Sequence, residues 1–511
     1  MKIGVVGGGL AGLAAAIRLA GEGHQVSIFE KNNHLGGKMN VWRSEGYTFD
    51  MGPTIITMPA VLERLFASVG RRMDDYLQMV SLDPQWRTFF ADGSQFDLYS
   101  SLEGAAAELN RFAPDEMANY LQFLAYAHRM YDISEKWFFW KPWGSLKEVM
   151  SAGSFGPKSL SLAASMDPMT SMDQAISKHF SNRHLAQLFE HFVQYVGSSP
   201  YLAPAILCLI PWVQLGLGCW YPMGGTGAIA GALGQLTDEL GVEVHLNAAV
   251  ERIEMQEGRA AGVVTDDGRV HKMDAVIANS DIVRTFRDLL PRDQSEPFLR
   301  KNAARLEPAC SGVVLYLGCR KRFPSLLHHN FFFSADSDAE FKDIYERRVP
   351  HADPTIYIAL PSRTDPTVAP AGCESVYALV HTPYISSAYD WEQNAARYRD
   401  VIVDKLERSG MAGLNDSIET ERMITPVDLE QLYWVNQGAI YGVVTKRGLT
   451  SAFKTGNRSE IPGLYFAGGS VNPGAGVPMV LMSGQIGAEC VLEDLGAPGS
   501  RSSSAAQTVR A

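Results

Sequence analysis

The feature that most restricts the fold is the start of the chain, where a short β-rich run, a cluster of glycines and an alanine-rich stretch follow one another. Residues 2–6 predict a strand and residues 13–19 a helix, with GGGLAG between them. In this G-x-G-x-x-G spacing, Gly7 permits a tight turn, Gly9 lets a diphosphate approach the backbone, and Gly12 lets helix and strand pack closely. The diphosphate is expected at the helix N-terminus, where free N–H groups and the helix dipole favour negative charge.

A second strand, HQVSIFE, ends at Glu30, about 20 residues after the glycines, where a ribose-binding carboxylate is expected. An acid at this position disfavours a 2′-phosphate, so FAD or NAD is expected rather than NADP. The next glycine turn, Gly36-Gly37-Lys38, brings a cation to where it can touch the diphosphate, although an ordinary turn between strands explains the same residues.

Three further segments resemble the FAD-dependent amine oxidase and phytoene desaturase superfamily. FDMGPTIITMP (49–59) resembles the family's FDxGPT segment beside the flavin, and residues 219–254 resemble the block that returns bacterial carotenoid desaturases to the cofactor domain. Residues 461–495 are similar to the C-terminal signature of those desaturases, and the resemblance covers nearly the whole chain. Many phytoene desaturases carry Thr-His before Pro-Gly-Ala-Gly, whereas this chain has Val471-Asn472, which leaves the substrate and the outcome of the reaction open.

The resemblance implies an α/β fold, in which a Rossmann-like FAD-binding domain of the GR2/amine-oxidase type carries an inserted α+β substrate domain. It also implies which residues bind FAD. These are Gly7, Gly9, Leu10, Ala11, Gly12, Glu30, Lys31, Gly37, Lys38, Gly52, Pro53, Thr54, Val250, Gly468, Gly469, Gly476, Val477, Pro478 and Met479. A helix that opens at NPGAGVP would direct a second N-terminus at the flavin and favour negative charge on the reduced ring.

The motifs predict a discontinuous cofactor domain with two inserts that together build a substrate and membrane-associating domain. The cofactor domain is expected over 1–70, 215–290 and 425–495, and the inserts over 71–214 and 291–424. The first insert is expected to be helical and the second rich in strands, with a further strand expected over 244–253 in the cofactor domain. Residues 496–511 are small and polar and predict a disordered tail.

The composition of residues 191–237 points to an oily substrate, because the segment contains no Lys, Arg, Asp or Glu. Its apolar run YLAPAILCLIPWVQLGLGCWYP has the length of a membrane span, but Pro204, Pro211 and Gln214 argue against one. We expect it to line a hydrophobic tunnel that could touch the bilayer, and a buried core helix is an equal alternative.

A second segment with membrane character is SEKWFFWKPWGSLKE, where aromatic residues 137–140 and Trp143 alternate with Lys136, Lys141 and Lys147. Such residues form either a monotopic anchor at headgroup depth or an aromatic core with surface lysines. His328-His329 is expected either to face the substrate or to be a loop that enters a strand.

Bulk properties narrow the compartment and the partners. The net charge of −11 argues against a nucleic-acid partner. The six scattered cysteines include no CxxC pair, so neither a zinc site nor a disulfide framework is predicted, and a reducing compartment fits best. No metal-ligand cluster, Walker loop or Ser/His/Asp array stands out, and no secretory signal is expected. The expected location is the cytoplasmic side of a membrane, as a peripheral protein.

The family resemblance implies a carotenoid desaturase that transfers hydride from an acyclic phytoene-like or diapophytoene-like polyene to FAD, with a quinone or oxygen as the electron acceptor. No proton acceptor can be chosen, and Asp132, Glu135 and Lys136 are guesses. A carotenoid oxygenase acting on terminal methyl groups and a carotene isomerase remain alternatives on the same scaffold. A soluble amine oxidase and a non-catalytic lipid-binding flavoprotein are more distant ones.

Overall fold

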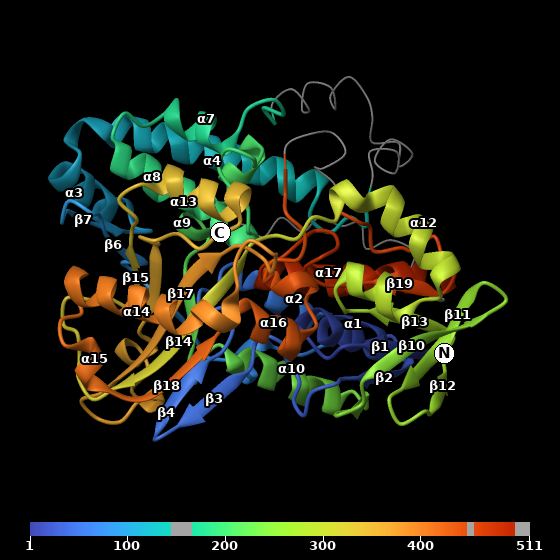
Figure 1. Cartoon of the computed structure of the whole chain (residues 1–511). Coiled ribbons are helices and arrows are strands. Elements are labelled where there is room, and N and C mark those ends of the chain that lie inside the picture. Colours follow the sequence, from blue (N-terminus) through green and yellow to red (C-terminus); the bar gives the residue numbers. More distant parts are fainter. Residues whose placement is uncertain (145–165, 447–453, 496–511) are drawn as a thin grey trace.

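The first of two large sheets is parallel, has five strands in the order β19-β13-β1-β2-β9, and lies on the right in Figure 1. The structure is a computed structural model that describes residues 1–144, 166–446 and 454–495. The five strands are β1 (Lys2–Val6), β2 (Gln25–Phe29), β9 (Glu243–His245), β13 (Ala275–Ala278) and β19 (Leu464–Phe466). Their central members are nearly continuous apolar runs, because both faces of the sheet are covered.

Helices cover one face of this sheet and a small antiparallel sheet covers the other. On the first face α1 packs against α10 and α17. The second face carries β10, β11 and β12, and side chains of β10 and β11 share a core with those of β1 and β13. The bounds are α1 (Leu10–Gly21), α10 (Gly227–Glu239), α17 (Val477–Leu495), β10 (Val250–Gln256), β11 (Arg259–Thr265) and β12 (Val270–Lys272).

The single strand expected over 244–253 is wrong. The chain leaves the parallel sheet after β9 and enters the antiparallel sheet at β10. Between them Asn247 has a φ of 53°, in the left-handed region that ends a strand. The apolar alternation of residues 244–253 therefore spans a turn in the chain, and the residues before and after this turn belong to different sheets.

The second sheet has seven strands in the order β18-β14-β17-β16-β15-β6-β7 and fills the left of Figure 1. One face packs on α14 (Trp391–Ser409), and the other faces the main core beneath the helices of the first insert. The strands are β6 (Trp86–Phe89), β7 (Gln95–Leu98), β14 (Ser311–Cys319), β15 (His329–Phe332), β16 (Ile356–Ala359), β17 (Glu374–Thr382) and β18 (Ile418–Ile424).

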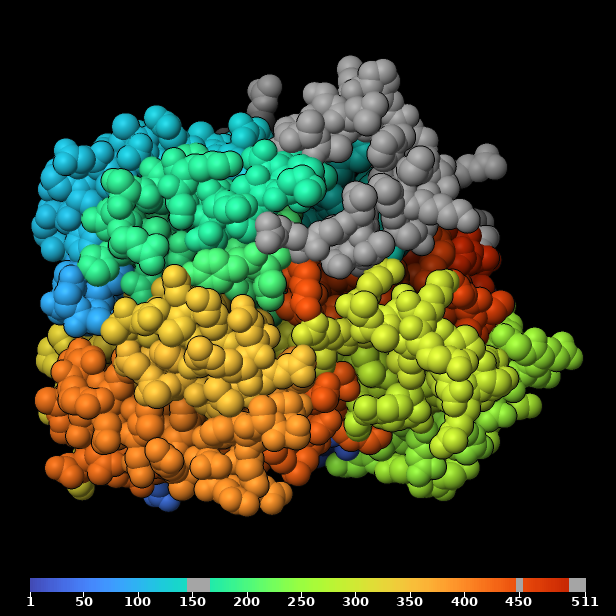
Figure 2. All heavy atoms as spheres, turned by 45° about the horizontal axis from the view of Figure 1, so that its top comes forward, coloured from blue at the N-terminus to red at the C-terminus, as the bar shows by residue number. Residues whose placement is uncertain are grey.

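The first insert is not purely helical, contrary to expectation, because it begins with β5 (Met79–Ser81), β6 and β7. Helices follow, and the cyan-to-green atoms of this insert border the gold-to-orange atoms of the second in Figure 2. They are α3 (Leu102–Phe112), α4 (Met117–Trp137), α7 (Met172–Ser177), α8 (Arg183–His191) and α9 (Leu209–Leu215).

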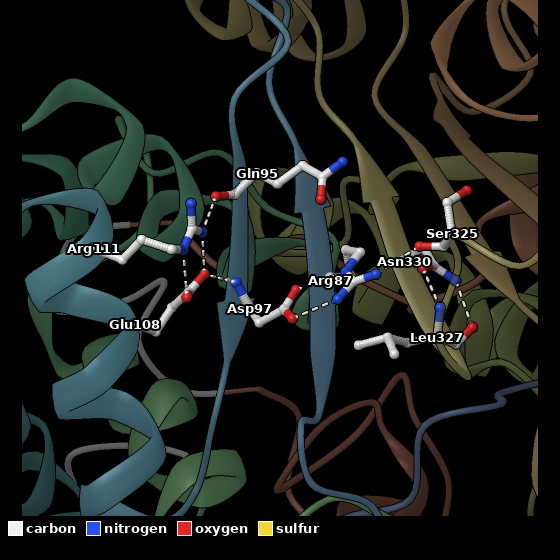
Figure 3. A network of polar contacts seen from close by, with 8 residues as sticks. All are labelled: Arg87, Gln95, Asp97, Glu108, Arg111, Ser325, Leu327 and Asn330. Atoms are coloured by element: carbon white, nitrogen blue, oxygen red, sulfur yellow. Dashed lines mark hydrogen bonds and ion pairs between the residues drawn. The ribbon is translucent and has the colours of Figure 1, made fainter.

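Charged side chains attach β6 and β7 to the rest of the seven-stranded sheet (Figure 3). Arg87 on β6 donates to both carboxylate oxygens of Asp97 on β7, at 2.8 and 2.7 Å, and to the Ser325 carbonyl before β15 at 2.7 Å. Glu108 on α3 accepts the backbone N–H of Asp97 at 2.8 Å. This network joins the hairpin made by the first insert to the strands made by the second.

All five strands of the parallel sheet fall within the ranges expected for the cofactor domain, and all seven of the second sheet within the two inserts.

The expected disordered tail, 496–511, and Lys147 lie outside the described residues. Every cysteine is free, and five of the six are buried. Within the described residues, no helix has the length and apolar character needed to cross a membrane.

Candidate active site

The carboxyl ends of β1, β13 and β19 lie side by side because the strands are parallel neighbours, and they form a crevice. The side chain of Asn279, which follows β13, lies beside the ends of the other two strands. Its side-chain amide donates to the Gly7 carbonyl at 3.1 Å, and a Cβ placed on Gly468 would come within 2.9 Å of its Oδ1. The crevice floor is therefore made of backbone and the Asn279 amide, with no room for a side chain at Gly468.

The first glycine turn has the geometry that the spacing predicts. Gly7 has a φ of 96°, which favours glycine. A Cβ on Gly12 would lie 2.1 Å from the Gly7 carbonyl oxygen, so only glycine lets α1 pack this closely on the turn. The N-terminus of α1 thus opens into a space that accepts a phosphate group.

The second glycine turn lies directly against the first. The Gly36 N–H donates to the Gly8 carbonyl at 2.8 Å, and a Cβ on Gly37 would meet the Gly9 Cα at 3.2 Å. Glu30 joins the first turn to the start of the loop that leads to the second, since its carboxylate accepts the backbone N–H of Gly8 at 2.7 Å and that of Asn32 at 2.8 Å. Gly36-Gly37 is therefore part of the crevice wall and more than a connection between strands.

Two partly buried lysines face this crevice. Lys38 donates to the Ile440 carbonyl at 2.7 Å, and Lys454 donates to the Val443 carbonyl at 2.5 Å. Burial lowers the pKa of each ammonium group to about 8. Cations beside a glycine cradle suit a dinucleotide diphosphate, because they and the N–H groups of the helix N-terminus offset its negative charge.

The crevice continues into one cavity of about 1200 Å³. Every residue that the sequence predicted to bind the cofactor lines this cavity except Gly12, which lies behind the turn. The lining residues are Gly7, Gly9, Leu10, Ala11, Glu30, Lys31, Gly37, Lys38, Gly52, Pro53, Thr54, Val250, Gly468, Gly469, Gly476, Val477, Pro478 and Met479. The last three begin α17, whose N-terminus opens into the cavity.

Beyond the crevice the cavity is an apolar chamber between the seven-stranded sheet and the helices of the first insert. Its wall is aromatic and aliphatic, and it includes Trp86, Phe138, Phe139, Tyr195, Leu207, Ile210, Val213, Val314, Phe331, Tyr357, Tyr377 and Leu379. The charged residues among the described lining are Glu30, Lys31, Lys38, Asp281 and Lys454, which belong to the crevice. The two histidines in the chamber, His191 and His381, have pKa values lowered by burial to about 3 and about 4, so both are neutral at pH 7.

The charge-free run 201–222 lines this chamber, as expected. It folds into two short helices, η4 (Ala205–Cys208) and α9, and Pro204, Ile206, Leu207, Leu209, Ile210, Val213 and Gln214 lie in the cavity wall. Proline at 204 and 211 divides the run, so it forms a wall instead of one long helix.

The guesses for a proton acceptor are wrong. Asp132, Glu135 and Lys136 are exposed on α4 and none lines the cavity, whereas Ser134 of the same helix does. His328 and His329 are buried and do not line the cavity either. His329 instead contacts the cavity wall from its outer side. Its Nδ1 lies 2.8 Å from the hydroxyl of the wall residue Tyr357, and that hydroxyl lies 2.6 Å from the Thr54 hydroxyl.

The described residues of the segment SEKWFFWKPWGSLKE lie in different surroundings. Phe138 and Phe139 line the cavity, while the Trp140 ring lies 3.9 Å from the guanidinium of Arg64. Asn472, at the point where the chain departs from the desaturase signature, donates its amide to the Lys141 carbonyl and also lines the cavity. Part of this segment therefore closes the chamber, and its membrane role stays a prediction.

Sequence reasoning missed Asn279, Asp281, Lys454 and the segment 440–442, all of which line the cavity. The first two had a usable signal, because NSD follows the apolar run AVIA, and residues after a parallel strand meet those after its neighbour. Lys454 has no local signal, since only the tertiary fold brings it to the glycine cradle.

The sequence matches the family model described as flavin containing amine oxidoreductase over residues 10–492. A 4,4′-diapolycopene oxygenase of Methylomonas sp. is 40% identical over 500 residues, which cover 97% of this chain and 98% of that protein. A 4,4′-diaponeurosporene oxygenase of Staphylococcus aureus (strain MSSA476) is 40% identical over 485 residues, 94% of this chain and 96% of the relative.

Solved structures with the same fold include an oxidoreductase from Methanosarcina mazei, with a TM-score of 0.61 and 18% identity over 96% of this chain and 100% of that one. Wild-type putrescine oxidase bound to putrescine gives a TM-score of 0.64 with 15% identity, over 96% of this chain and 99% of that one. Likeness at this identity concerns the fold, and it confirms the predicted fold class.

Proposed function

This chain belongs to the flavin-containing amine oxidoreductase family and is an FAD-dependent oxidoreductase, and on that premise we propose that it oxygenates a terminal methyl group of an acyclic diapocarotenoid. The names of its relatives favour the oxygenase alternative over the desaturase that the sequence first suggested. The glycine cradle, the two partly buried lysines and the N-termini of α1 and α17 are the parts of the chain that would hold FAD.

The observation that carries the proposal is the apolar chamber, which continues directly from the crevice and presents no ionised side chain among its described lining residues. A long hydrocarbon gains about 25 cal/mol for each Å² of apolar surface that it buries. A protonated amine would lose its hydration and find no carboxylate in this chamber, which argues against a soluble amine substrate.

The overall change balances as R–CH₃ + O₂ → R–CHO + H₂O, in which dioxygen accepts the four electrons that the methyl carbon loses. Bound FAD supplies a two-electron acceptor and donor next to the substrate. The chain's own contribution is to exclude water, to align the polyene end with the crevice, and to hold positive charge on Lys38 and Lys454 near the anionic cofactor.

A membrane surface is the natural source of such a substrate, and a feature of the cavity supports uptake from one. Met169 lines the cavity and yet is 86% exposed, so the cavity reaches the surface at an apolar residue. Met166 and Pro168, its neighbours in sequence, also line the cavity. Sedimentation of the holoenzyme with lipid vesicles, compared with Met169→Glu, tests this part of the proposal: equal recovery of both proteins on vesicles contradicts it.

The decisive experiment gives the purified holoenzyme an acyclic diapocarotenoid in detergent with isotopically labelled dioxygen. We expect a product that has gained one labelled oxygen and lost two hydrogens, seen by mass spectrometry. Loss of two hydrogens without oxygen would establish a desaturase, and an unchanged composition with an altered spectrum would establish an isomerase. Turnover of a soluble amine with release of hydrogen peroxide would refute carotenoid chemistry altogether.

A further inference from the structure

Four polar side chains interrupt the apolar wall of the chamber at one place, which we call the polar subsite. They are His191 at the end of α8, Gln194 in η3 (Phe192–Val196), His381 on β17, and Tyr441. The Tyr441 hydroxyl lies 3.2 Å from His381 Nε2, and the ring centres of His191 and His381 are 6.4 Å apart.

Two of these cavity-lining residues, His191 and Gln194, have unused hydrogen-bonding capacity. His191 is only 8% exposed, lines the cavity, and makes no hydrogen bond to any residue of the described part of the chain. The Gln194 carbonyl accepts from Tyr345 at 3.1 Å, while its NH₂ group has no partner among the described residues. Because buried polar groups in proteins are normally paired, a ligand is expected to complete this set.

The Tyr441 end of the polar subsite lies next to the crevice. Tyr441 is followed by Gly442, whose Cβ position would be 2.8 Å from the Ser470 Cα, and Ser470 follows the two glycines at the end of β19. The end of a substrate that reaches the crevice therefore passes this subsite. Neutral imidazole and amide groups offer both donors and acceptors, which suits a hydroxyl or a carbonyl oxygen.

We propose that the polar subsite binds the oxygen that the reaction installs on the polyene end and retains the alcohol until it becomes the aldehyde. This inference rests on the proposed function. The first half is R–CH₃ + O₂ + 2 e⁻ + 2 H⁺ → R–CH₂OH + H₂O, and the second is R–CH₂OH → R–CHO + 2 e⁻ + 2 H⁺. The second half returns the electrons and protons that the first consumes, so an alcohol that escapes leaves the enzyme short of two electrons.

The test compares binding of three probes to the holoenzyme by quenching of protein fluorescence: a diapocarotenoid hydrocarbon, its terminal alcohol and its terminal aldehyde. His191→Phe keeps a ring against Phe331 but removes the hydrogen bond, so binding of the alcohol and the aldehyde should weaken about 3- to 10-fold while that of the hydrocarbon is unchanged. His191→Asn, which retains a donor and an acceptor, should restore part of the preference. His191→Phe should also release more free alcohol per aldehyde formed.

Phe331→Leu is the matched control, since Phe331 touches the same imidazole and lines the same cavity, and it should affect the three probes alike. Equal weakening of all three probes by His191→Phe, or no change in the ratio of alcohol to aldehyde, would overturn the inference. If the wild-type enzyme binds the hydrocarbon and does not prefer the oxygenated probes, this inference is refuted while the proposed function is not. A wild-type enzyme that binds none of the three sinks the proposed function and this inference with it.

Discussion

Two glycines inside helices should respond in opposite ways to alanine. Gly484 lies in α17 where it crosses α1, and a Cβ there would be 2.2 Å from the Ala11 carbonyl oxygen and 2.9 Å from the Ala14 Cβ. Gly231 lies in α10, and a Cβ there would meet nothing within 4 Å. The pair isolates helix packing from helix propensity, because both substitutions are the same.

The magnitudes follow from these distances. Alanine is favoured over glycine inside a helix by about 1 kcal/mol, so Gly231→Ala should stabilise the protein by up to that amount. At Gly484 the contact must open by about 1 Å to reach an ordinary carbon–oxygen separation, and neither side is a flexible side chain. Overpacking of this kind costs about 1–3 kcal/mol, which leaves Gly484→Ala about 2 kcal/mol less stable than the wild type after the gain in propensity, at the upper end of the range.

A shift of α17 also moves Val477, Pro478 and Met479, which line the cofactor crevice. Gly484→Ala should therefore lose bound flavin as well as stability, whereas Gly231→Ala should keep both. Thermal unfolding of the apoproteins and flavin absorbance after purification measure the two effects. If Gly484→Ala unfolds at the same temperature as Gly231→Ala and keeps its flavin, the close crossing of α1 and α17 does not position the cofactor.

Three further predictions concern the crevice and its support. Burial lowers the pKa of Lys38 and Lys454 to about 8, so both ammonium groups lose their charge above that pH. FAD should therefore bind more weakly as the pH rises from 7 to 9.5, which titration by flavin fluorescence measures. In Lys38→Met the affinity for FAD should change less with pH. Glu30→Ala leaves the buried Gly8 N–H and the partly buried Asn32 N–H unpaired. It should cost about 1–3 kcal/mol for the buried group and less for the other, read from denaturant unfolding of the apoprotein; an unchanged midpoint would contradict it. Tyr357→Phe removes the hydroxyl between Thr54 and His329 and should cost about 1–3 kcal/mol by the same assay, and a stabilised protein would show that the bridge is not needed.

The crevice could be predicted from sequence because its demands are local. A tight turn at Gly7 and a close helix approach at Gly12 each require glycine, and spacing alone reveals both. The chamber is different, since His191 and His381 meet only after two inserts fold onto each other. Burial there depends on long-range packing, for which a single sequence carries no periodic signal.

Segment 244–253 shows why a correct local pattern can still mislead. Its alternation is real on both sides of the break, but Asn247 turns the chain into another sheet. Asp132, Glu135 and Lys136 failed for a related reason, since they share a helix with the cavity-lining Ser134 and lie on its outer side. Helical register is visible in the sequence only when the apolar face is unbroken, and α4 has a mixed one.

The five-stranded sheet takes strands from the two ends of the chain, with β1 beginning at Lys2 and β19 ending at Phe466. During synthesis both inserts are therefore made before β19 and α17 exist, so the nucleotide cradle around the first glycine turn is completed only at the end. The substrate chamber can assemble earlier than the nucleotide cradle that serves it. Binding of flavin would then stabilise the folded chain only after its last strand has docked. A shortage of flavin would leave the apolar chamber open to solvent, and such protein is prone to aggregate.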